Sequence, residues 1–308
     1  MMENKLFDFR SCEKTVYYYC THNVFNSIIT NKSVWLADML KTNDYAEIIY
    51  TMSSVVDAFD KQLEKKTFSF DDEENAYIQD KISKLVKKRC NSILSNCFWL
   101  AICFSSQGDD LSQWRAYGND GKGYAIGFDL KKLKEFVRHP LFRVDNICYD
   151  EIEKNEAVAI AIAKLFSTIM SIKNKHGILN DCNRQLSKPI QDYVRDWSIE
   201  LSNNIAFYKS SDFAAEKETR WCYSRMIYQS QLEKVADSSK LKHLRFSVKE
   251  KDIVAYLEEP IDLNLISEIV IGPTNNVTEY DMKMYLCSKG IDVKNVSIKK
   301  SHIPYRSK

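Results

Sequence analysis

Residues 97–129 read CFWLAICFSSQGDDLSQWRAYGNDGKGYAIGFD. Phe98, Leu100, Ile102 and Phe104 alternate with other residues, as the side chains on one face of a β-strand do. A glycine-rich turn and a second apolar run, which ends at Asp129, complete the stretch. We therefore expect two central strands of a sheet, with a short helix in the connection between them.

The connection between the two runs carries the signals of a two-turn helix. Asp110 followed by Gln113 has the spacing of an N-cap and its reciprocal partner. Gly118 is placed to end the helix. This structural role accounts for all three residues without a ligand.

The same short helix carries Trp114, Arg115 and Tyr117, which capping does not explain. Helical spacing places the two aromatic rings on one face and the arginine on another. We expect Trp114 to pack on the sheet, and one of Arg115 or Tyr117 to meet solvent or a pocket. Aromatic residues beside an arginine can hold a purine or a phosphate, although core and surface roles are commoner.

The chain before this stretch opens with a strand, a helix and a strand. Val16–Cys20 is aromatic and β-branched, Thr21 can cap a helix, and Val34–Leu36 suits a second short strand. Alternation sends Tyr18 to one face of the first strand and its two neighbouring tyrosines to the other. At least one of the three hydroxyls therefore needs a partner or water.

Longer helices and further strands fill the rest of the chain. Thr42 or Asn43 can cap a long helix, in which Glu47 either completes a capping box or faces a pocket. Spacing alone favours the capping role. After an acidic loop at 68–75, we expect a helix that ends near Ser95. Patterning predicts three further helices, at about 151–173, 183–208 and 278–289. It predicts strands at 142–149, 219–227, 241–248, 253–257, 268–271 and 293–298.

The order of these elements predicts the fold class. Strands interrupted by helices of unequal length, without a βαβ rhythm, favour a mixed α+β fold with a mainly antiparallel sheet. We expect one domain over residues 1–308, with helical insertions at about 44–95 and 150–208. The sequence contains neither GxGxxG nor GxxxxGK[ST], so the common nucleotide-binding loops are absent.

Composition restricts the partners that the chain is expected to have. Lys and Arg number 44 against 42 Asp and Glu, which gives no global reason to expect nucleic acid or anionic lipid. Five scattered histidines and nine cysteines without a CxxC pair give no zinc signature, so no metal cofactor is expected. The charged N-terminus and the lack of a run near ~20 apolar residues predict a cytoplasmic protein without a membrane span. Cysteines within apolar runs are expected to be reduced core thiols, namely Cys97, Cys103, Cys148 and Cys222.

A second group of charged residues lies at 213–220, which reads FAAEKETR. If this segment is extended, Glu216, Glu218 and Arg220 share one face. Two carboxylates on one face raise each other's pKa unless they are solvated, paired or used. Arg220 can simply pair with one of them; in a pocket, one glutamate can act as a base or stabilise a developing cationic sugar.

In their order, these segments resemble a bacterial family catalogued as domain of unknown function 2971. Each motif is short, but six of them follow one another from about Val16 to Arg306. The matching positions are Tyr17-Tyr18-Tyr19-Cys20 before Ser27-Ile28-Ile29, Val34-Trp35-Leu36-Ala37 with Asn43-Asp44 and Glu47, Cys103-Phe104-Ser105 with Trp114, Tyr117 and Gly123–Phe128, Lys209 with Phe213, Glu216, Glu218 and Arg220, Ile269–Pro273, and Ser301–Arg306.

The layout of that family is more distantly similar to the ADP-ribosyltransferase fold. The resemblance implies NAD as a substrate and catalytic positions at Tyr18, Ser105 and Glu216 or Glu218. In that fold a histidine or arginine stands where this chain has Tyr18, which leaves a hydroxyl to bind the ribose. The further residues that we expect to bind NAD are Arg115, Tyr117, Trp114, Asn43, Lys209 and Arg220.

Three hypotheses of function follow. The first is a cytoplasmic ADP-ribosyltransferase-like toxin or effector of bacterial anti-phage defence, with an unknown protein or nucleic-acid target and a possible defence-system partner protein. The second is a non-catalytic nucleotide- or protein-binding sensor that uses a cleft around the Trp114 helix. The third is a metal-dependent nuclease, for which Asp109, Asp110, Glu216 and Glu218 offer carboxylates.

Overall fold

A computed structural model describes residues 14–41, 45–66, 71–180, 184–227, 244–249 and 251–305. In this part of the chain, ten strands form one mixed sheet in which every pairing but one is antiparallel. Eight strands follow the order β10-β9-β4-β1-β3-β2-β8-β7, while β6 pairs with β3 and β5. The predicted α+β class is therefore confirmed. The strands are β1 Thr15–Cys20, β2 Ser33–Asp38, β3 Cys97–Ser105, β4 Tyr124–Asp129, β5 Phe142–Asn146, β6 Glu218–Met226, β7 Leu244–Lys249, β8 Asp252–Pro260, β9 Ile266–Ile271 and β10 Ser297–Lys300.

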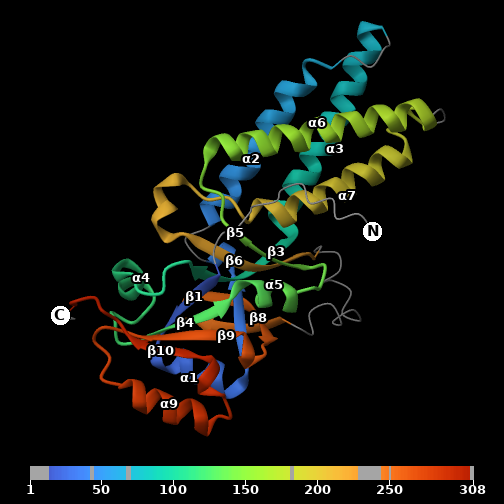
Figure 1. Ribbon diagram of the computed structural model, residues 1–308. Helices are drawn as coiled ribbons and strands as arrows, with labels where there is room; N and C mark the ends of the chain where they lie inside the picture. The colour runs from blue at the N-terminus through green and yellow to red at the C-terminus, as the bar shows by residue number, and fades with distance from the viewer. Residues whose placement is uncertain are drawn as a thin grey trace.

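Helices cover both faces of this sheet (Figure 1). The long helices α2, α3, α6 and α7 gather on one side, and α1 and α9 lie on the other. The α-helices are α1 His22–Asn31, α2 Tyr45–Leu63, α3 Asp72–Asn96, α4 Leu111–Ala116, α5 Leu130–Phe136, α6 Glu151–His176, α7 Lys188–Ile205 and α9 Glu279–Ser288. Short 3-10 helices are η1 Met39–Lys41, η2 Ser211–Glu216, η4 Leu263–Leu265 and η5 Val293–Asn295.

Strand β3 separates two hydrophobic cores. Trp99 and Ala101 on one face belong to the core that the four long helices share with the sheet. Leu100 and Phe104 on the other face belong to the core under α1 and α9. The alternation of residues 98–104 therefore reflects a strand buried on both sides, which is why nearly every position of the run is apolar.

The sheet divides at one edge of β3. Strand β6 pairs with β3 along its whole length, from Cys97 to Ser105. The opposite edge pairs with β2 at Leu100 and Ala101 and with β1 at Ser105. No described strand pairs with that edge between these points, so β1 and β2 diverge from a common strand and leave a notch.

The predicted helix in the central stretch is confirmed with its cap. Asp110 accepts hydrogen bonds from the backbone N–H groups of Ser112 and Gln113, at 2.8 and 3.1 Å, and α4 begins at Leu111. The N–H of Gly118 donates to the carbonyl of Gln113 at 3.1 Å, which closes the last turn. Asp110 and Gly118 thus define the helix as the spacing predicts. The reciprocal bond expected from Gln113 is not formed, because the N–H of Asp110 donates to the hydroxyl of Tyr19 at 3.0 Å.

Several predicted boundaries are wrong. Helix α3 begins at Asp72 rather than after a loop that runs to residue 75, because Asp71 caps it through the N–H of Glu74 at 2.8 Å. Helix α7 begins at Lys188 rather than near 183, since Pro189 fits only the first turn of a helix. Strand β5 ends at Asn146, and patterning misses the short helix α5.

The segment before β6 is also not extended. Residues Ser211–Glu216 form the 3-10 helix η2, and β6 begins at Glu218. Lys217 between them adopts a left-handed conformation with φ of 45°. Glu218 and Arg220 therefore share a face of β6, as predicted. Glu216 does not belong to that strand and lies at the end of η2.

Helix α6 is notable for its apolar composition. In the described part of the chain, it is the one helix long and apolar enough to cross a membrane by length and composition. Its inner face, with Leu165 and Phe166, packs in the helical core. Core helices of soluble proteins meet the same criterion, so the observation assigns α6 no membrane role.

Candidate functional site

A cavity of about 570 Å³ lies where β1 and β2 diverge from β3. Its walls come from distant parts of the sequence: Tyr18 in β1, Cys103 in β3, Tyr117 at the end of α4, and Glu216 at the end of η2. Glu47 in the first turn of α2 lines it as well. The sheet notch, the central stretch and the helical insertions thus all contribute to one site.

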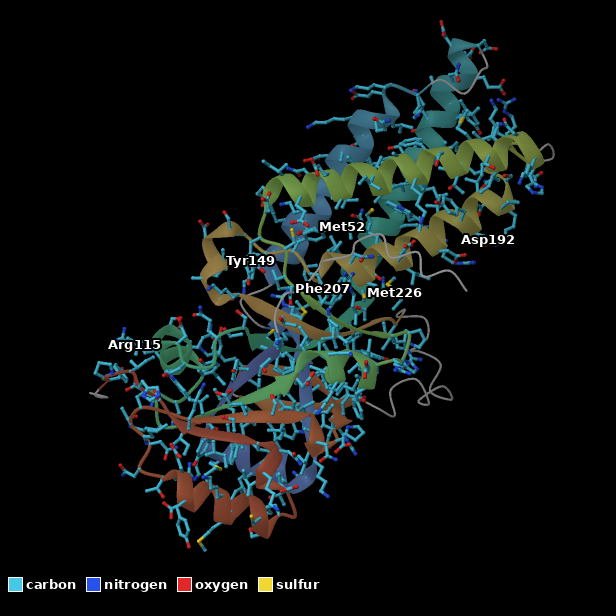
Figure 2. All side chains as sticks on the ribbon, viewed as in Figure 1. Met52, Arg115, Tyr149, Asp192, Phe207 and Met226 are labelled. Carbon is cyan, nitrogen blue, oxygen red and sulfur yellow. The ribbon has the colours of Figure 1, made fainter. Side chains whose placement is uncertain are left out.

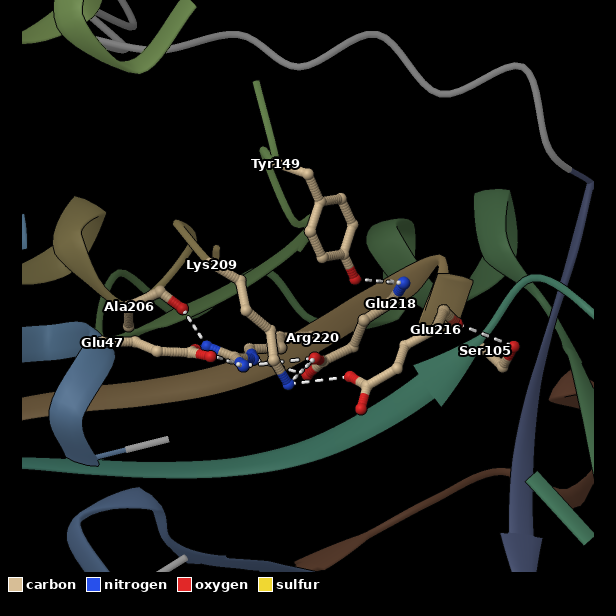
Figure 3. Close-up of polar contacts among 8 residues, drawn as sticks. All are labelled: Glu47, Ser105, Tyr149, Ala206, Lys209, Glu216, Glu218 and Arg220. Carbon is tan, nitrogen blue, oxygen red and sulfur yellow. Dashed lines mark hydrogen bonds and ion pairs between the residues drawn. The ribbon is translucent and has the colours of Figure 1, made fainter. Parts of the chain in front are cut away.

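A chain of alternating charges forms one side of this cavity (Figure 3). The ammonium group of Lys209 pairs with Glu216 Oε2 at 2.7 Å and with Glu218 Oε2 at 3.3 Å. Arg220 Nε in turn donates to Glu218 Oε1 at 2.5 Å. Arg220 Nη2 lies 4.0 Å from Glu47 Oε2, which extends the network to α2.

Local backbone structure places these side chains together. The N–H of Lys209 donates to the carbonyl of Cys148 at 3.1 Å, beside a parallel bridge between Cys148 and Tyr208. The left-handed Lys217 reverses the chain direction between η2 and β6. Both glutamates therefore meet one ammonium group although they lie on different elements.

Glu218 is held in its ionised form. Burial by itself raises the pKa of this carboxyl, but Arg220 and Lys209 beside it outweigh burial and hold the pKa below its ordinary value. The backbone N–H of Glu218 also donates to the hydroxyl of Tyr149 at 2.9 Å. The two cations thus more than compensate for the effect of burial on Glu218.

Arg220 is a buried member of the network and does not itself line the cavity. Its Nη1 donates to the carbonyl oxygen of Ala206 at 2.6 Å, at the end of α7. It therefore holds Glu218 in place and joins β6 to the helical layer. The predicted role of Arg220 in NAD binding is not tested, and its position allows contact with the cavity only through Glu218.

Ser105, a predicted catalytic residue, is buried and does not line the cavity. Its hydroxyl donates to the backbone carbonyl of Glu216 at 3.0 Å and accepts from the N–H of Gln107 at 3.2 Å. The N–H of Ser106 also donates to the carbonyl of Lys217 at 3.0 Å. Ser105 thus positions the turn that carries Glu216, which is a structural contribution to the site.

The three tyrosines of β1 divide as alternation predicts. Tyr18 packs edge-on against Phe104, with ring centroids 6.2 Å apart, in the core opposite to that of Tyr17 and Tyr19. All three tyrosines line the cavity. Burial raises the pKa of Tyr18, so its hydroxyl stays protonated at neutral pH. Tyr17 donates to Glu268 at 3.2 Å, and Tyr19 donates to the carbonyl of Gln107 at 2.7 Å.

The short helix α4 contributes less to the cavity than its composition suggests. Trp114 is fully buried, and its Nε1 donates to Asp109 at 2.8 Å. Arg115 lies at α4 (Figure 2), with its guanidinium 5.1 Å above the ring of Tyr305. It does not line the cavity. Of the three predicted binding residues on this stretch, only Tyr117 lines it, with 54% of its surface exposed.

The remaining predicted residues have mixed outcomes. Lys209 lines the cavity as its predicted binding role requires. Asn43 lies outside the described residues. Cys103 was expected to be a core thiol, but it is exposed and lines the cavity, because it sits in the notch where β3 lacks a neighbour.

Two lining residues escaped sequence reasoning in whole or in part. Glu47 lines the cavity, which was the stated alternative to its capping role; the expected cap at Thr42 or Asn43 lies outside the described residues. Trp35 in β2 belongs to a short strand and to one of the family motifs, and neither assigned it to a site, yet it is 52% exposed and lines the cavity. Their contribution depends on the approach of β2 and α2 to β3, which local patterns do not encode.

The four carboxylates suggested for a nuclease do not form one described metal site: Glu216 and Glu218 share the ammonium group of Lys209, whereas the two aspartates have other partners. Asp109 accepts hydrogen bonds from Trp114, from the hydroxyl of Ser301 at 2.6 Å and from the N–H of His302 at 2.9 Å. Asp110 caps α4. Across the described ranges, no group of three or more His, Cys, Asp and Glu side chains is placed to hold a metal ion.

The fold and the site define an α+β protein with an open, mainly antiparallel sheet and a charged cavity at a division of that sheet. Residues 113–221 match the model of the family described as "Protein of unknown function (DUF2971)". This match over part of the chain supports the resemblance to the family that the ordered motifs predict. The matched segment runs from α4 into β6 and includes Lys209, Glu216 and Glu218. No curated protein and no solved structure matches the chain.

Proposed function

We propose that the cavity binds NAD and that the protein cleaves it, as an ADP-ribosyltransferase or an NAD glycohydrolase. The observation that carries the proposal is the convergence of Tyr18, Glu216 and Glu218 on one cavity, from positions about 200 residues apart. The cavity volume of about 570 Å³ is within the range of small-molecule and cofactor sites. The distant resemblance of the family layout to the ADP-ribosyltransferase fold supports the same ligand.

The charges suit the chemistry of this reaction. Nicotinamide leaves with the electrons of the glycosidic bond, so positive charge develops on the ribose before water or an acceptor group attacks. A fixed carboxylate stabilises that charge, and it does so most effectively in a site shielded from water. Glu216 is the better placed group, because its side chain is 27% exposed whereas that of Glu218 is 6% exposed.

Other groups would orient the substrate. The protonated hydroxyl of Tyr18 offers one hydrogen bond to a ribose hydroxyl, where an imidazole stands in the resembling fold. Lys209 holds Glu216 through one carboxylate oxygen, Oε2. Ser105 acts on the position of the turn and not on the ligand.

The test is nicotinamide release from NAD, with transfer of labelled ADP-ribose to a bacterial lysate measured in parallel. We expect wild-type protein to exceed the Glu216→Gln, Glu218→Gln double variant by about 10²- to 10³-fold, the usual loss when a charge-stabilising group is removed. Glu156→Gln, at an exposed position of α6, serves as the control. A wild-type signal no higher than that of the double variant would refute catalysis, and EDTA in the same assay tests for metal dependence.

A second candidate is a sensor that binds a nucleotide without cleaving it. The ion pairs of both glutamates favour it, because Lys209 and Arg220 already neutralise much of the charge that catalysis would use. It predicts calorimetric binding that survives the glutamate substitutions and is lost in Tyr117→Ala. Arg115→Ala, which removes a side chain outside the cavity, should leave binding unchanged.

The biological setting is the least direct part of the proposal. A role as a toxin or effector in anti-phage defence, inside the bacterial cytoplasm, rests on the family resemblance alone. The acceptor, whether protein or nucleic acid, and a partner protein of a defence system remain predictions.

A further inference from the structure

One tryptophan differs from the other four in its environment. Trp35 in β2 is 52% exposed and lines the cavity. Trp99, Trp114, Trp197 and Trp221 are each at most 2% exposed. Exposed apolar side chains that gather at a concave surface are a mark of ligand-binding grooves, so the placement of Trp35 at the cavity indicates a role in binding.

The indole of Trp35 is held as part of an aromatic stack. Its ring lies nearly parallel to that of Tyr256, with centroids 4.3 Å apart and an angle of 24° between the planes. Strand β2 pairs with β8, with Ala37 opposite Tyr256, so the two rings are diagonal neighbours on one sheet face. One side of the indole therefore packs against Tyr256, and its exposed area adjoins the cavity.

The surroundings of Trp35 indicate the kind of ligand. Three other half-exposed apolar side chains line the same cavity, from α1, the end of α4 and η2: Val24, Tyr117 and Phe213. The carboxylates of Glu216 and Glu218 line it as well, which suits the hydroxyl groups of a sugar. A site with flat apolar surfaces beside hydrogen-bond acceptors matches a nucleoside, whose base is planar and whose ribose is polar.

We propose that Trp35 is a stacking platform for the base of a bound nucleoside or nucleotide. An aromatic ring binds a base through its π-face with little dependence on sequence or substituents. Tyr256 fixes the platform in advance, so little side-chain freedom is lost on binding. The proposal deepens the proposed function, on which it rests for the class of ligand, but it concerns binding and not cleavage.

The exposure pattern makes the platform directly measurable in the full chain. Acrylamide quenching of tryptophan fluorescence reports chiefly on Trp35, since the other four indoles are buried. We expect adenosine, AMP and NAD to protect Trp35 from acrylamide in a saturable manner, whereas ribose 5-phosphate gives no protection. In Trp35→Ala, calorimetry should show affinity for AMP reduced by about 5- to 150-fold, the usual range for loss of one base stack.

Trp35→Phe keeps an aromatic ring against Tyr256 and should lose less affinity than the alanine variant. Unchanged melting temperatures in both variants would show that the fold is kept, as expected for a half-exposed side chain. Equal protection by ribose 5-phosphate, no protection by any base-containing compound, or AMP affinity unaffected in Trp35→Ala would overturn the platform. Protection by adenosine without NAD cleavage would support the platform while refuting the catalytic part of the proposed function.

Discussion

The buried contact between Glu218 and Arg220 decides much of what the site can do. Burial of one charge alone is costly, whereas a pair with satisfied hydrogen bonds is tolerated. Arg220 has contacts to the carboxylate of Glu218 and to the carbonyl of Ala206. Removing the carboxylate would leave the guanidinium without its main partner inside the protein.

We predict that Glu218→Gln destabilises the protein by about 3 kcal/mol at neutral pH, the lower end for breaking a buried ion pair. The pKa of Glu218 is lowered in the folded state, so its stabilising effect is present above its ordinary pKa of 4.5. The effect is lost as the pH falls through the folded pKa, when the carboxyl takes up a proton. Urea unfolding of wild type and variant across this pH range should show their difference shrinking in acid.

Glu156→Gln provides the matched control, because it makes the same chemical change at an exposed site on α6. It should cost within about 0.5 kcal/mol at every pH. A constant difference between wild type and Glu218→Gln from neutral pH to pH 3 would contradict the assigned charge state.

At the scale of elements, two glycines allow β1, β4 and the end of β9 to approach closely. A Cβ atom at Gly123 would overlap the carbonyl oxygen of Cys20 and lie 2.9 Å from that of Gly118. The N–H of Gly272 donates to the carbonyl of Gly123 at 3.1 Å. Backbone atoms surround this position, so the overlap cannot be relieved by rotation of a side chain.

We predict that Gly123→Ala destabilises the protein by about 3 kcal/mol or more, at the upper end for overpacking. Gly290→Ala is the comparison, because a Cβ there meets nothing within 4 Å, although φ is +79°. Its cost should stay near 1 kcal/mol, the strain of a left-handed alanine. Thermal unfolding measures both, and an equal loss in the two variants would show that close approach at Gly123 is not the cause.

Elements were predictable where a local signal defines them. The caps at Thr21, Asp110 and Thr278 fix the starts of their helices, because a side chain within three residues satisfies the N–H groups. The site was predictable only in part. Glu216, Glu218 and Tyr18 were found from motifs, but the indirect role of Ser105 was not.

The unpredicted features depend on contacts between distant segments. Ser105 is bound to the turn before β6 through residues more than 100 positions away. Glu47 and Trp35 line the cavity because α2 and β2 pack near β3. The packing of α2 and β2 near β3 cannot be predicted from the spacing of apolar residues or of capping residues. It depends on how the strands pair in the assembled sheet.

At the scale of the molecule, the helical insertions and the sheet share a core and a site. The indole N–H of Trp99 in β3 donates to the carbonyl of Ser202 in α7 at 2.7 Å. Arg220 of β6 bonds Ala206 just beyond the same helix. These contacts join the helical layer to the sheet, and the folding of residues 1–308 as one unit stays a prediction.

Phe59 offers a test of that unity, because it lies deep in the helical layer, where its ring stacks on Phe166 of α6 with centroids 5.5 Å apart. We predict that Phe59→Ala costs about 3–5 kcal/mol through lost burial and a residual cavity. If the chain unfolds as one unit, helical circular dichroism and the fluorescence of the buried tryptophans will shift together to lower urea. The same comparison in a Trp197→Phe background removes the tryptophan of α7 from the fluorescence signal. If Phe59→Ala then lowers the urea midpoint of the helical signal but leaves the midpoint of the fluorescence signal unchanged, the long helices form a separate domain.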